Sequence, residues 1–444
     1  MANMLHNIFL GGLFSDVESS NILSDRGCLE ALFEFERGLA KIQGKIGLIP
    51  ELSAKSLESR LKTIELSEIK YNQFSTEDGI IIPELMRNIK EKFLSNEDSQ
   101  YLHWGVTSQD AIDTARCLQL RNFLNLVEAR LKVFLDLGAT KASTYKYLPI
   151  AARTRGQIAA VTTLGAKFAI NFSPVLNQKT KLSALRPNLL RLSLGGAVGT
   201  LNSFGEKSDI LVKELAQELN LNPAVIPWHT NREAFVELAC ICTIITSCFG
   251  KFGADVLWMA QSELQEVKLV NVGSSSAMPH KKNPIIAEAL MALADINNSL
   301  LTCIGSAMVH RNERDGVAWT KEIVIMQQIL HCTGAACKLA LTLLKAVKPI
   351  ERNIGRTIDG TKGLIFAENA VNQLSQYYQK SEAKRMVSDA CKNVEVNKST
   401  LFLELKKMVG SALDLGMIFD PGENLGQAPT IVENFTYKVQ KENV

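Results

Sequence analysis

The stretch REAFVELACICTIITSCFGKFGADVLWM, residues 232–259, carries the longest helical pattern in the chain. Its apolar side chains recur at spacings of three and four residues: Phe235, Leu238, Cys242, Ile245, Phe249, Phe252, Val256 and Met259. Such spacing places them on one face of an α-helix. The pattern predicts a single helix from Arg232 to Lys268, of roughly ten turns. A stripe of this length is typical of a helix bundle or of a seam between subunits.

Four further segments show helical spacing and can pack against this helix. They are predicted at about Ser108–Leu137, Gln157–Leu185, Pro284–Met308 and Trp319–Val347. Pro174 is expected to bend the second of them, because proline removes a backbone hydrogen bond. Asn283 as cap followed by Pro284 is a typical helix start. Strand-like alternation is scarce along the chain.

Shorter helices flank the long ones on both sides. Ser24 is placed to cap an N-terminal helix that stops near Gly47 and Pro50. The pattern breaks again over residues 346–363, before a last set of short helices. We therefore expect an all-α protein with three helical domains: an N-terminal domain over 1–104, a central bundle of very long helices over 105–348, and a C-terminal domain over 349–444.

The composition favours a soluble intracellular protein. Of 444 residues, 49 are basic and 46 acidic, and this near balance gives no footprint for nucleic acid. An anionic ligand would have to be captured by local clusters of charge. The nine cysteines are scattered, which favours reduced thiols in the cytoplasm. No signal peptide and no uninterrupted apolar run long enough to cross a membrane is apparent.

The loop GSSSAMPHKKNP, Gly273–Pro284, is the first candidate for chemistry. It ends where a long helix is predicted to begin, so free N–H groups there favour an anion. Lys281 adds a positive charge, and Asn283 can donate or accept a hydrogen bond. A serine beside such a site can exchange a proton if its alkoxide is stabilised. On composition alone, however, a surface linker is the more common use of such a segment.

The stretch YLHWGVTSQDAIDT, Tyr101–Thr114, is the second candidate. His103 precedes a turn, and Thr107 and Ser108 open the next predicted helix. Their hydroxyl groups and the free amides of that helix point to one spot, with an imidazole near enough to act as acid or base. The alternative is an ordinary helix cap beside a histidine with a structural role.

Cationic side chains near other segment ends could bind carboxylates. In ARTRGQ, residues 152–157, Arg153 and Arg155 suit several carboxylates, because a guanidinium pairs with a carboxylate through two hydrogen bonds. PWHTNRE and HRNERDGVAW add His229, Arg232 and Arg314. The alternative for the last two is structural pairing with Glu233 and Glu313. The six histidines show no metal-binding spacing, and no glycine-rich motif follows a strand, so neither a metal nor a nucleotide cofactor is expected.

The segment SSAMPHKKNP, Ser275–Pro284, closely resembles the signature loop GSSxMPxKxNP of the fumarase/aspartase superfamily. HWGVTSQDAIDT resembles that superfamily's TSxD region. Nearly the whole chain follows the pattern of the 3-carboxy-cis,cis-muconate cycloisomerases within it, including RTRGQ, LRPNLLRLSLGGAVGTL, PWHTNRE, ERDGVAW and GTKGLIFAE. The resemblance implies a homotetramer whose core is a bundle of long helices and whose active sites are each built by three chains.

The resemblance also implies roles for individual residues. Ser275 would be the catalytic acid or base, with His103 able to deliver a proton through it. Lys281 and Asn283 would hold a substrate carboxylate, with Thr107 and Ser108 contributed by another subunit. Arg153, Gln157, His229, Arg232 and Arg314 would add contacts to a small polycarboxylate substrate. The expected reaction is the addition of a carboxylate to a diene to give a lactone, in the protocatechuate branch of the β-ketoadipate pathway.

Arg155 separates this activity from that of its relatives. Fumarases and most other members have a histidine there, and adenylosuccinate lyase needs a proton donor near its departing amine. A lactonising carboxylate is already ionised at neutral pH, so an arginine that orients it is enough. Adenylosuccinate lyase, or another lyase that releases fumarate, is the alternative, and a non-catalytic structural protein is a remote one. Ser274 in place of the motif's glycine, and Ala383-Lys384 in place of an Ala-His pair, depart from the pattern.

Overall fold

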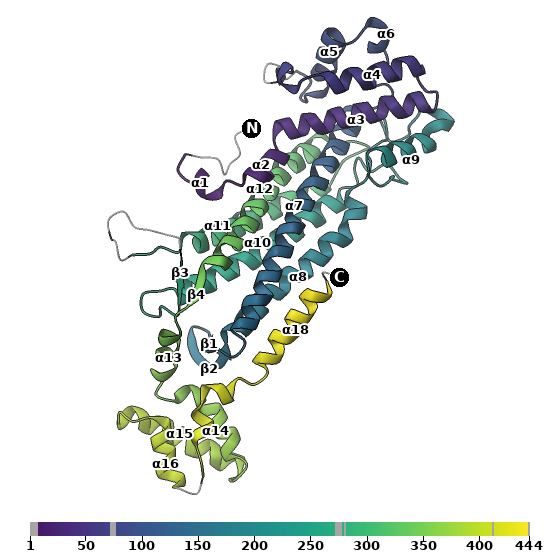
Figure 1. The fold of residues 1–444 in the computed structure, drawn as a ribbon. Helices are drawn as coiled ribbons and strands as arrows, with labels where there is room; N and C mark the ends of the chain where they lie inside the picture. Colours follow the sequence, from purple (N-terminus) through teal and green to yellow (C-terminus); the bar gives the residue numbers. More distant parts are fainter. Residues whose placement is uncertain (1–7, 72–76, 271–277, 279–280, 411–412, 443–444) are drawn as a thin grey trace. The chain divides into compact units, whose positions relative to one another are not determined.

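The computed structural model describes residues 8–71, 77–270, 278, 281–410 and 413–442, and the fold within them is all-α with short strands. Five long helices dominate (Figure 1): α7 Ser108–Thr144, α8 Leu164–Leu189, α10 Glu233–Met259, α11 Ile285–Gly305 and α12 Gly316–Ala346. The predicted fold class is therefore confirmed.

Contacts group the chain into two compact units, each built from separate stretches of sequence. The first unit comprises residues 1–129, 178–246 and 293–336, and the second comprises 130–177, 247–292 and 337–444. Each of the five long helices contributes one part to each unit. The division at residues 104 and 348 into three domains stays a prediction.

The first unit holds the N-terminal helices and one part of each long helix. Its other elements are α1 Gly11–Phe14, α2 Val17–Ile22, α3 Asp25–Lys45, α4 Glu51–Thr63, η1 Leu66–Glu68, α5 Ile82–Phe93, α6 Asn96–Ser99, η3 Gly205–Lys207, α9 Ser208–Glu218 and η4 Ser306–Met308. Ser24 caps α3 as predicted, because its side chain accepts a hydrogen bond from the Gly27 N–H. Helix α3 packs along α4 and α9 (Figure 1).

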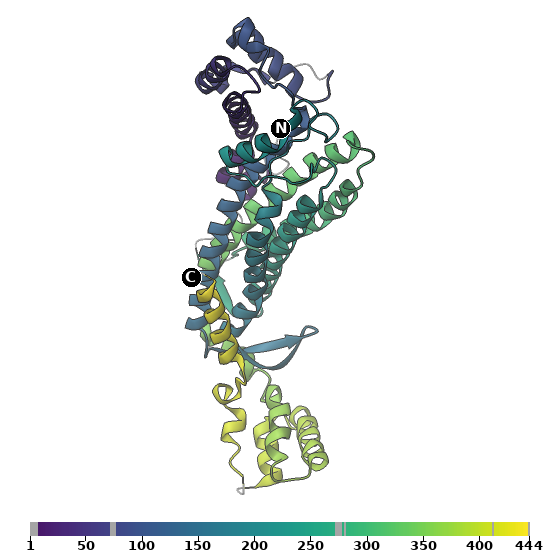
Figure 2. The ribbon, with the colours of Figure 1, turned by 90° about the vertical axis from the view of Figure 1, so that its right-hand side faces the viewer.

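The second unit holds the strands and the C-terminal helices. Its elements are β1 Pro149–Thr154, β2 Gln157–Thr163, β3 Val267–Leu269, β4 Val347–Pro349, α13 Glu351–Asp359, η5 Leu364–Phe366, α14 Ala367–Leu374, α15 Lys380–Val396, α16 Leu401–Val409, α17 Gly416–Phe419, η6 Pro421–Asn424 and α18 Ala428–Lys441. Strands β1 and β2 form an antiparallel hairpin, and β3 pairs antiparallel with β4. In Figure 2 the blue hairpin projects from the helices of this unit.

The apolar stripe of α10 lies inside the protein's own core. Every member, from Phe235 to Met259, is buried. In the second unit Phe249 and Phe252 contact Phe134 of α7 edge to face, with ring centroids 5.0 and 6.3 Å apart. The interpretation as a bundle is thus correct, and the stripe is not the exposed seam of a subunit.

Several element boundaries differ from the sequence prediction. Helix α10 ends at Met259 rather than Lys268, since its apolar stripe stops there and Val267 begins a strand. Residues 157–163 form β2 instead of helix, and α7 continues to Thr144. Helix α8 runs unbroken through Pro174, which is exposed, so the carbonyl that proline frees lies on the solvent side of the helix.

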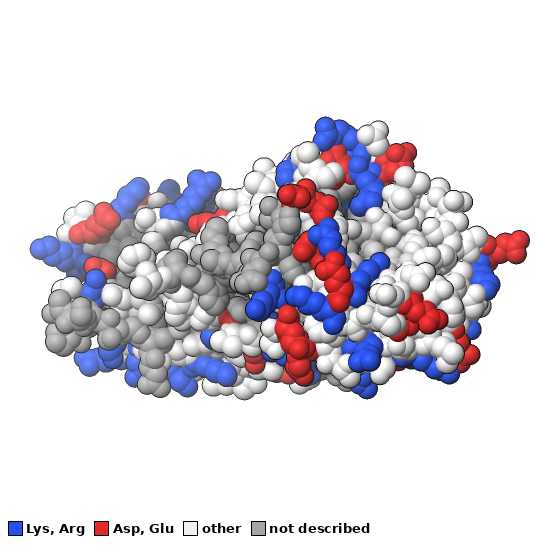
Figure 3. Space-filling model, turned by 90° about the horizontal axis from the view of Figure 1, so that it is seen from above, with Lys and Arg blue, Asp and Glu red and all other residues white. Residues whose placement is uncertain are grey.

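Three of the long helices are more apolar than we expected from the sequence. By length and composition alone, α10, residues 285–308 and α12 could each cross a membrane. About three fifths of the apolar window of α10 and almost four fifths of that of α12 are buried within the protein, against 39% for residues 285–308. On the face shown in Figure 3, basic and acidic side chains are intermingled, in keeping with the balanced charge.

Candidate active site

The predicted site residues form two groups, one in each unit. The first unit holds His103, Thr107, Ser108, His229, Arg232 and Arg314, and the second holds Arg153, Arg155, Gln157, Lys281 and Asn283. Ser275 lies outside the described residues. Each group is built by its own helix ends and turns.

The start of α7 is fixed by a single buried carboxylate. Thr107 precedes the helix, and its backbone N–H donates to Asp110 Oδ2 at 3.1 Å. The same carboxylate accepts from the Gly195 and Gly196 N–H groups at 2.9 and 3.0 Å. It is fully buried. Asp110 therefore ties the Thr107–Ser108 helix start to the neighbouring glycine turn, which leaves the free N–H groups of the first turn in a defined position.

Arg314 lies at this helix start and is held by neutral acceptors. Its Nη1 donates to Thr107 Oγ1 at 2.8 Å, and its Nε donates to Gln109 Oε1 at 3.1 Å. Among the described residues no carboxylate pairs with it, and its side chain is exposed. The predicted pairing with Glu313 is thus not formed. An exposed, unpaired guanidinium beside a hydroxyl and a helix N-terminus can bind a carboxylate.

His103 is held by a carboxylate that the sequence analysis missed. Its Nδ1 lies 2.5 Å from Oε1 of Glu36 on α3. A carboxylate only accepts, so Nδ1 carries the proton. Burial lowers the pKa of His103. The negative charge of Glu36 and its hydrogen bond raise that pKa by more than burial lowers it, so the net shift is upward. The backbone at His103 is left-handed, with φ 60°. The imidazole is therefore held ready to donate a proton.

His229, predicted to bind substrate, is packed against the carboxylate that fixes the start of α7. It is buried, and its Nε2 lies 2.7 Å from Asp110 Oδ1. The ring also packs closely on Gly195, where an added Cβ would lie 2.9 Å from its Cε1. The ring is thus held against Asp110 and the glycine turn, while its Nδ1 is buried without a hydrogen-bond partner among the described residues.

Arg232 is a structural residue. It is 1% exposed, and its guanidinium forms two hydrogen bonds with Asp113 and two with Glu322, at 2.6–3.1 Å. Burial raises the pKa of both carboxyl groups, but the positive charges beside them hold it below its usual range. The predicted alternative of structural pairing is correct in kind, although Glu233 is not the partner. With its charge compensated, Arg232 has nothing to offer a substrate.

Arg155 occupies the tip of the β1–β2 hairpin. Thr154 pairs with Gln157, so Arg155 and Gly156 form a two-residue loop. Both have positive φ, 53° and 80°, as a type I′ turn requires. Asn, Asp and Gly are the usual residues there, and an arginine costs backbone strain. The Arg155 side chain is exposed and has no ion-pair partner among the described residues. Strain at an exposed, uncompensated cation is typical of a functional position.

Arg153 and Gln157 flank this tip and differ in their surroundings. The Arg153 guanidinium donates to both oxygens of Glu266, at 2.9 and 3.1 Å, and Glu266 is fully buried. The prediction that Arg153 binds substrate is therefore not supported, because its charge is already neutralised. Gln157 is exposed and lines a cavity of about 440 Å³ with Lys362 and Glu395.

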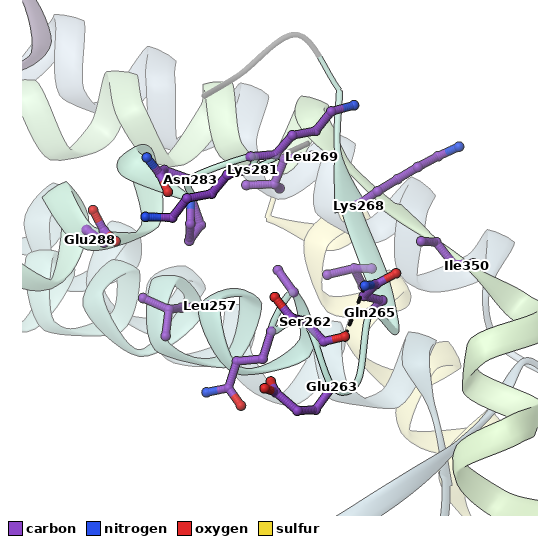
Figure 4. Close-up of a pocket in the computed structure, with 15 residues that line it drawn as sticks. Leu257, Ser262, Glu263, Gln265, Lys268, Leu269, Lys281, Asn283, Glu288 and Ile350 are labelled. Atoms are coloured by element: carbon purple, nitrogen blue, oxygen red, sulfur yellow. Dashed lines mark hydrogen bonds between the residues drawn. The ribbon is translucent and has the colours of Figure 1, made fainter. Parts of the chain in front are cut away.

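Lys281 and Asn283 border a cavity of about 850 Å³ in the second unit. Figure 4 shows them at the start of α11, with Ser262 and Glu263 across the cavity. The carbonyl of Pro284 accepts from the Glu288 N–H, so Pro284 takes the cap position predicted for Asn283. Lys281 is exposed and unpaired among the described residues. The predicted juxtaposition of a lysine, an amide and a helix N-terminus is thus present.

Other functional positions could not be recognised from the sequence. Glu36, Glu266 and Gln109 are 67, 113 and 205 residues away from the groups they hold, which are His103, Arg153 and Arg314. Only Asp110 carried a local signal, as an acidic residue in the first turn of a helix. Within the described ranges, histidine, cysteine and acidic side chains form no group of three that could hold a metal.

Comparison with known proteins gives the class of this fold and site. Residues 30–295 match the family model described as lyase. The chain belongs to this family, part of the fumarase/aspartase superfamily, and is an enzyme of that kind.

Individual relatives narrow the comparison. A 3-carboxy-cis,cis-muconate cycloisomerase of Acinetobacter baylyi is 31% identical, over 93% of this chain and 92% of that protein. The crystal structure of a 3-carboxy-cis,cis-muconate lactonizing enzyme from Pseudomonas putida superposes with a TM-score of 0.93 at 29% identity, covering 99% of this chain and 100% of the other. An adenylosuccinate lyase of Methanocaldococcus jannaschii is 27% identical, over 94% and 92%.

Proposed function

We propose that this protein is a 3-carboxy-cis,cis-muconate cycloisomerase that forms 4-carboxymuconolactone. The observation that carries the proposal is Arg155, an exposed and unpaired arginine held in a left-handed conformation at a hairpin tip. An arginine can orient a carboxylate nucleophile but cannot give up a proton at neutral pH. This suits lactone formation, in which the attacking group is already ionised. It does not suit a lyase that must protonate a departing amine.

Some cationic side chains of the candidate site are neutralised by buried carboxylates, and others are free. Arg153 and Arg232 are paired with buried carboxylates, whereas Arg155, Lys281 and Arg314 have no such partner in the part of the chain that the structure describes. The three free cations match the three carboxylates of a carboxymuconate. We assign them, with Thr107, Ser108 and Asn283, to substrate binding.

In the proposed mechanism a carboxylate oxygen of the bent substrate adds to the diene, so that a C–O bond forms. The electron pair of the double bond moves to the carbon beside another carboxylate. Lys281, Asn283 and the start of α11 stabilise the charge that develops there. Ser275 or His103 then delivers a proton to that carbon. The reverse sequence is a β-elimination, the reaction common to the superfamily.

The active protein is proposed to be a cytoplasmic homotetramer whose sites combine the two groups from different copies. The support is the surface of residues 285–308, which are apolar enough to span a membrane yet mostly uncovered within one chain. Ile285 and Met291 are 38% and 36% exposed on this helix. Packing α11 against α11 of other copies would remove this surface from water without a membrane.

The proposal is tested by the loss of ultraviolet absorbance of 3-carboxy-cis,cis-muconate when purified protein is added, with no metal supplied. A parallel assay uses adenylosuccinate. Turnover of the muconate alone is the expected result. Cleavage of adenylosuccinate instead would overturn the assignment of Arg155 and make the protein a purine-pathway lyase. No turnover of either compound would contradict the proposed substrate.

The proton donor is tested in the same assay with Ser275→Ala. Ser276→Ala is the matched control, since it removes the same hydroxyl from the adjacent position. Loss of turnover in Ser275→Ala but not in Ser276→Ala is expected. The opposite result would move the catalytic role by one residue and leave the reaction unchanged.

A further inference from the structure

We propose that Gln109 is a positioning residue that holds Arg314 in place for a substrate carboxylate and keeps its charge free. The inference rests on the proposed function, because Arg314 is assigned there to substrate binding. Gln109 is the second residue of α7 and is 3% exposed. It lies beside the exposed guanidinium of Arg314, and its Oε1 accepts a hydrogen bond from Arg314 Nε at 3.1 Å.

The orientation of the Gln109 amide is fixed by its other contacts. Its Nε2 donates to Asp113 Oδ2 at 3.1 Å and to the backbone carbonyl of His229 at 2.9 Å. Both partners can only accept, so the nitrogen must face them and Oε1 must face outward. A reversed amide would place its oxygen against a carboxylate and a carbonyl. The network therefore presents one acceptor to Arg314.

The partners of Gln109 are themselves immobile. Asp113 is fully buried and accepts from both terminal nitrogens of Arg232, at 2.7 and 3.1 Å, and from the Trp319 indole at 3.1 Å. Asp110 fixes the preceding turn of the chain through Thr107. Arg314 is thus held on two sides, by Gln109 and Thr107, whose own positions are set by the buried network.

Because Gln109 is neutral, Arg314 keeps an uncompensated charge, unlike the neighbouring arginines. Arg116 pairs with Glu322, Arg232 with Asp113 and Glu322, and Arg311 with Asp315. A carboxylate at position 109 would neutralise Arg314 and would also leave an oxygen facing Asp113 and the His229 carbonyl, where Gln109 now donates. An amide supplies the geometry and leaves the whole positive charge for a ligand.

The test compares Gln109→Met with Gln119→Met. Both residues are on α7, and Gln119 makes a single hydrogen bond, to the Ile22 carbonyl, away from Arg314. Loss of ground-state binding raises KM with little change in kcat. We expect Gln109→Met to raise KM for 3-carboxy-cis,cis-muconate about tenfold, the scale of a hydrogen bond to a charged group. The control should keep the wild-type KM.

A double-mutant cycle distinguishes positioning from a general structural effect. If Gln109 acts through Arg314, the KM of Gln109→Met with Arg314→Ala should equal that of Arg314→Ala alone. Gln109→Glu should raise KM more than Gln109→Met, because it neutralises the guanidinium and also sets a carboxylate oxygen against Asp113. The inference is wrong if the two single-variant effects on KM multiply in the double variant. It is also wrong if the KM of Gln109→Met equals that of the wild type.

A direct binding measurement separates this inference from the proposed function. Calorimetric titration with tricarballylate, an unreactive tricarboxylate, repeats the cycle without catalysis. Should the wild type bind tricarballylate without converting the muconate, the proposed reaction fails while coupling between Gln109 and Arg314 still supports the inference. Absence of coupling, or of binding to the wild type, would contradict it.

Discussion

The Nδ1 of His103 lies 2.5 Å from Oε1 of Glu36, and this contact joins the turn before α7 to the middle of α3. Glu36 is 2% exposed, and its other oxygen is buried without a partner in the described part of the protein. A half-satisfied buried carboxylate is costly, so the attraction of a protonated imidazole is needed to hold it. His103 is therefore charged over a wider range of pH than a free histidine.

Replacing Glu36 with Gln should shift the pH dependence of both activity and stability. If His103 supplies the proton in the proposed mechanism, it does so in its protonated form, so the rate should fall as pH rises through its pKa. Glu36→Gln lowers that pKa and moves the fall to lower pH. The pKa of His103 is raised in the folded protein. The contact between His103 and Glu36 therefore stabilises the fold fully below the unfolded pKa of about 6.5, and this stabilisation is lost as pH rises through the folded pKa. Unfolding by urea at pH 5.5 and 9 should show a larger loss at pH 5.5.

The control for this change is Glu30→Gln, an exposed residue of the same helix that pairs with Arg26. Its pH profile should match that of the wild type. A profile for Glu36→Gln that overlays the wild type would mean that His103 takes no part in proton transfer.

Breaking the Arg153–Glu266 pair should destabilise the protein rather than weaken substrate binding. Glu266 is fully buried, so Glu266→Gln leaves the arginine without its counter-charge and should lower the free energy of unfolding by about 3 kcal/mol. The double variant Arg153→Met with Glu266→Leu should recover most of this loss, since no unpaired charge remains. Chemical denaturation measures all three proteins.

The exposed Arg26–Glu30 pair provides the matched comparison, and Glu30→Gln should cost less than about 1 kcal/mol. If instead Arg153→Met left stability unchanged and raised KM, Arg153 would be a substrate-binding residue as first predicted.

The sequence predicted the long helices well because burial of one face has a simple period. Every apolar residue of the stripe from Phe235 to Met259 is buried. The hairpin was missed because its turn signal is weak: a type I′ turn usually begins with Asn, Asp or Gly, and here it begins with Arg155. The error over residues 157–163 follows from the same cause.

The candidate site was predictable only as far as its local motifs extend. Thr107, Lys281 and Asn283 sit at helix starts, which sequence spacing can locate. Whether a cation is free or compensated depends on distant partners, as with Arg232 and Glu322, which are 90 residues apart. Nothing in a single sequence gives such pairings, so Arg153, His229 and Arg232 could not be separated from Arg155 and Arg314 in advance.

Lys141 should make stability depend on pH in the alkaline range. Its buried ammonium donates to the Val347 carbonyl at 2.7 Å, and burial, with the nearby charge of Lys348, lowers its pKa to about 8. The unfolded chain has a value of about 10.4 and binds the proton more tightly. The free energy of unfolding of the wild type should therefore rise relative to Lys141→Met between pH 8 and pH 10.5, by linkage. Lys345→Met, an exposed position on α12, should show no such trend, and a pH-independent difference for Lys141→Met would contradict the depressed pKa.

Replacing Arg155 should separate activity from stability. Arg155→Asn places at the first turn position a residue that tolerates φ 53°, so the free energy of unfolding should rise by about 0.5–1 kcal/mol. The same change removes the group that we propose orients the attacking carboxylate, and kcat/KM should fall by roughly 100-fold, the scale of a bidentate charged contact. Arg155→His should also lose lactonisation. Thermal unfolding and the absorbance assay measure the two effects.

Lys398→Asn is the matched control for the backbone term. Lys398 is an exposed residue with φ 48° that no feature of the candidate site involves, so this variant should gain similar stability with unchanged kcat/KM. Full activity in Arg155→Asn or Arg155→His would remove the arginine from the mechanism. A loss of activity together with a loss of stability would mean that Arg155 supports the hairpin rather than the substrate, and its left-handed backbone would then need another cause.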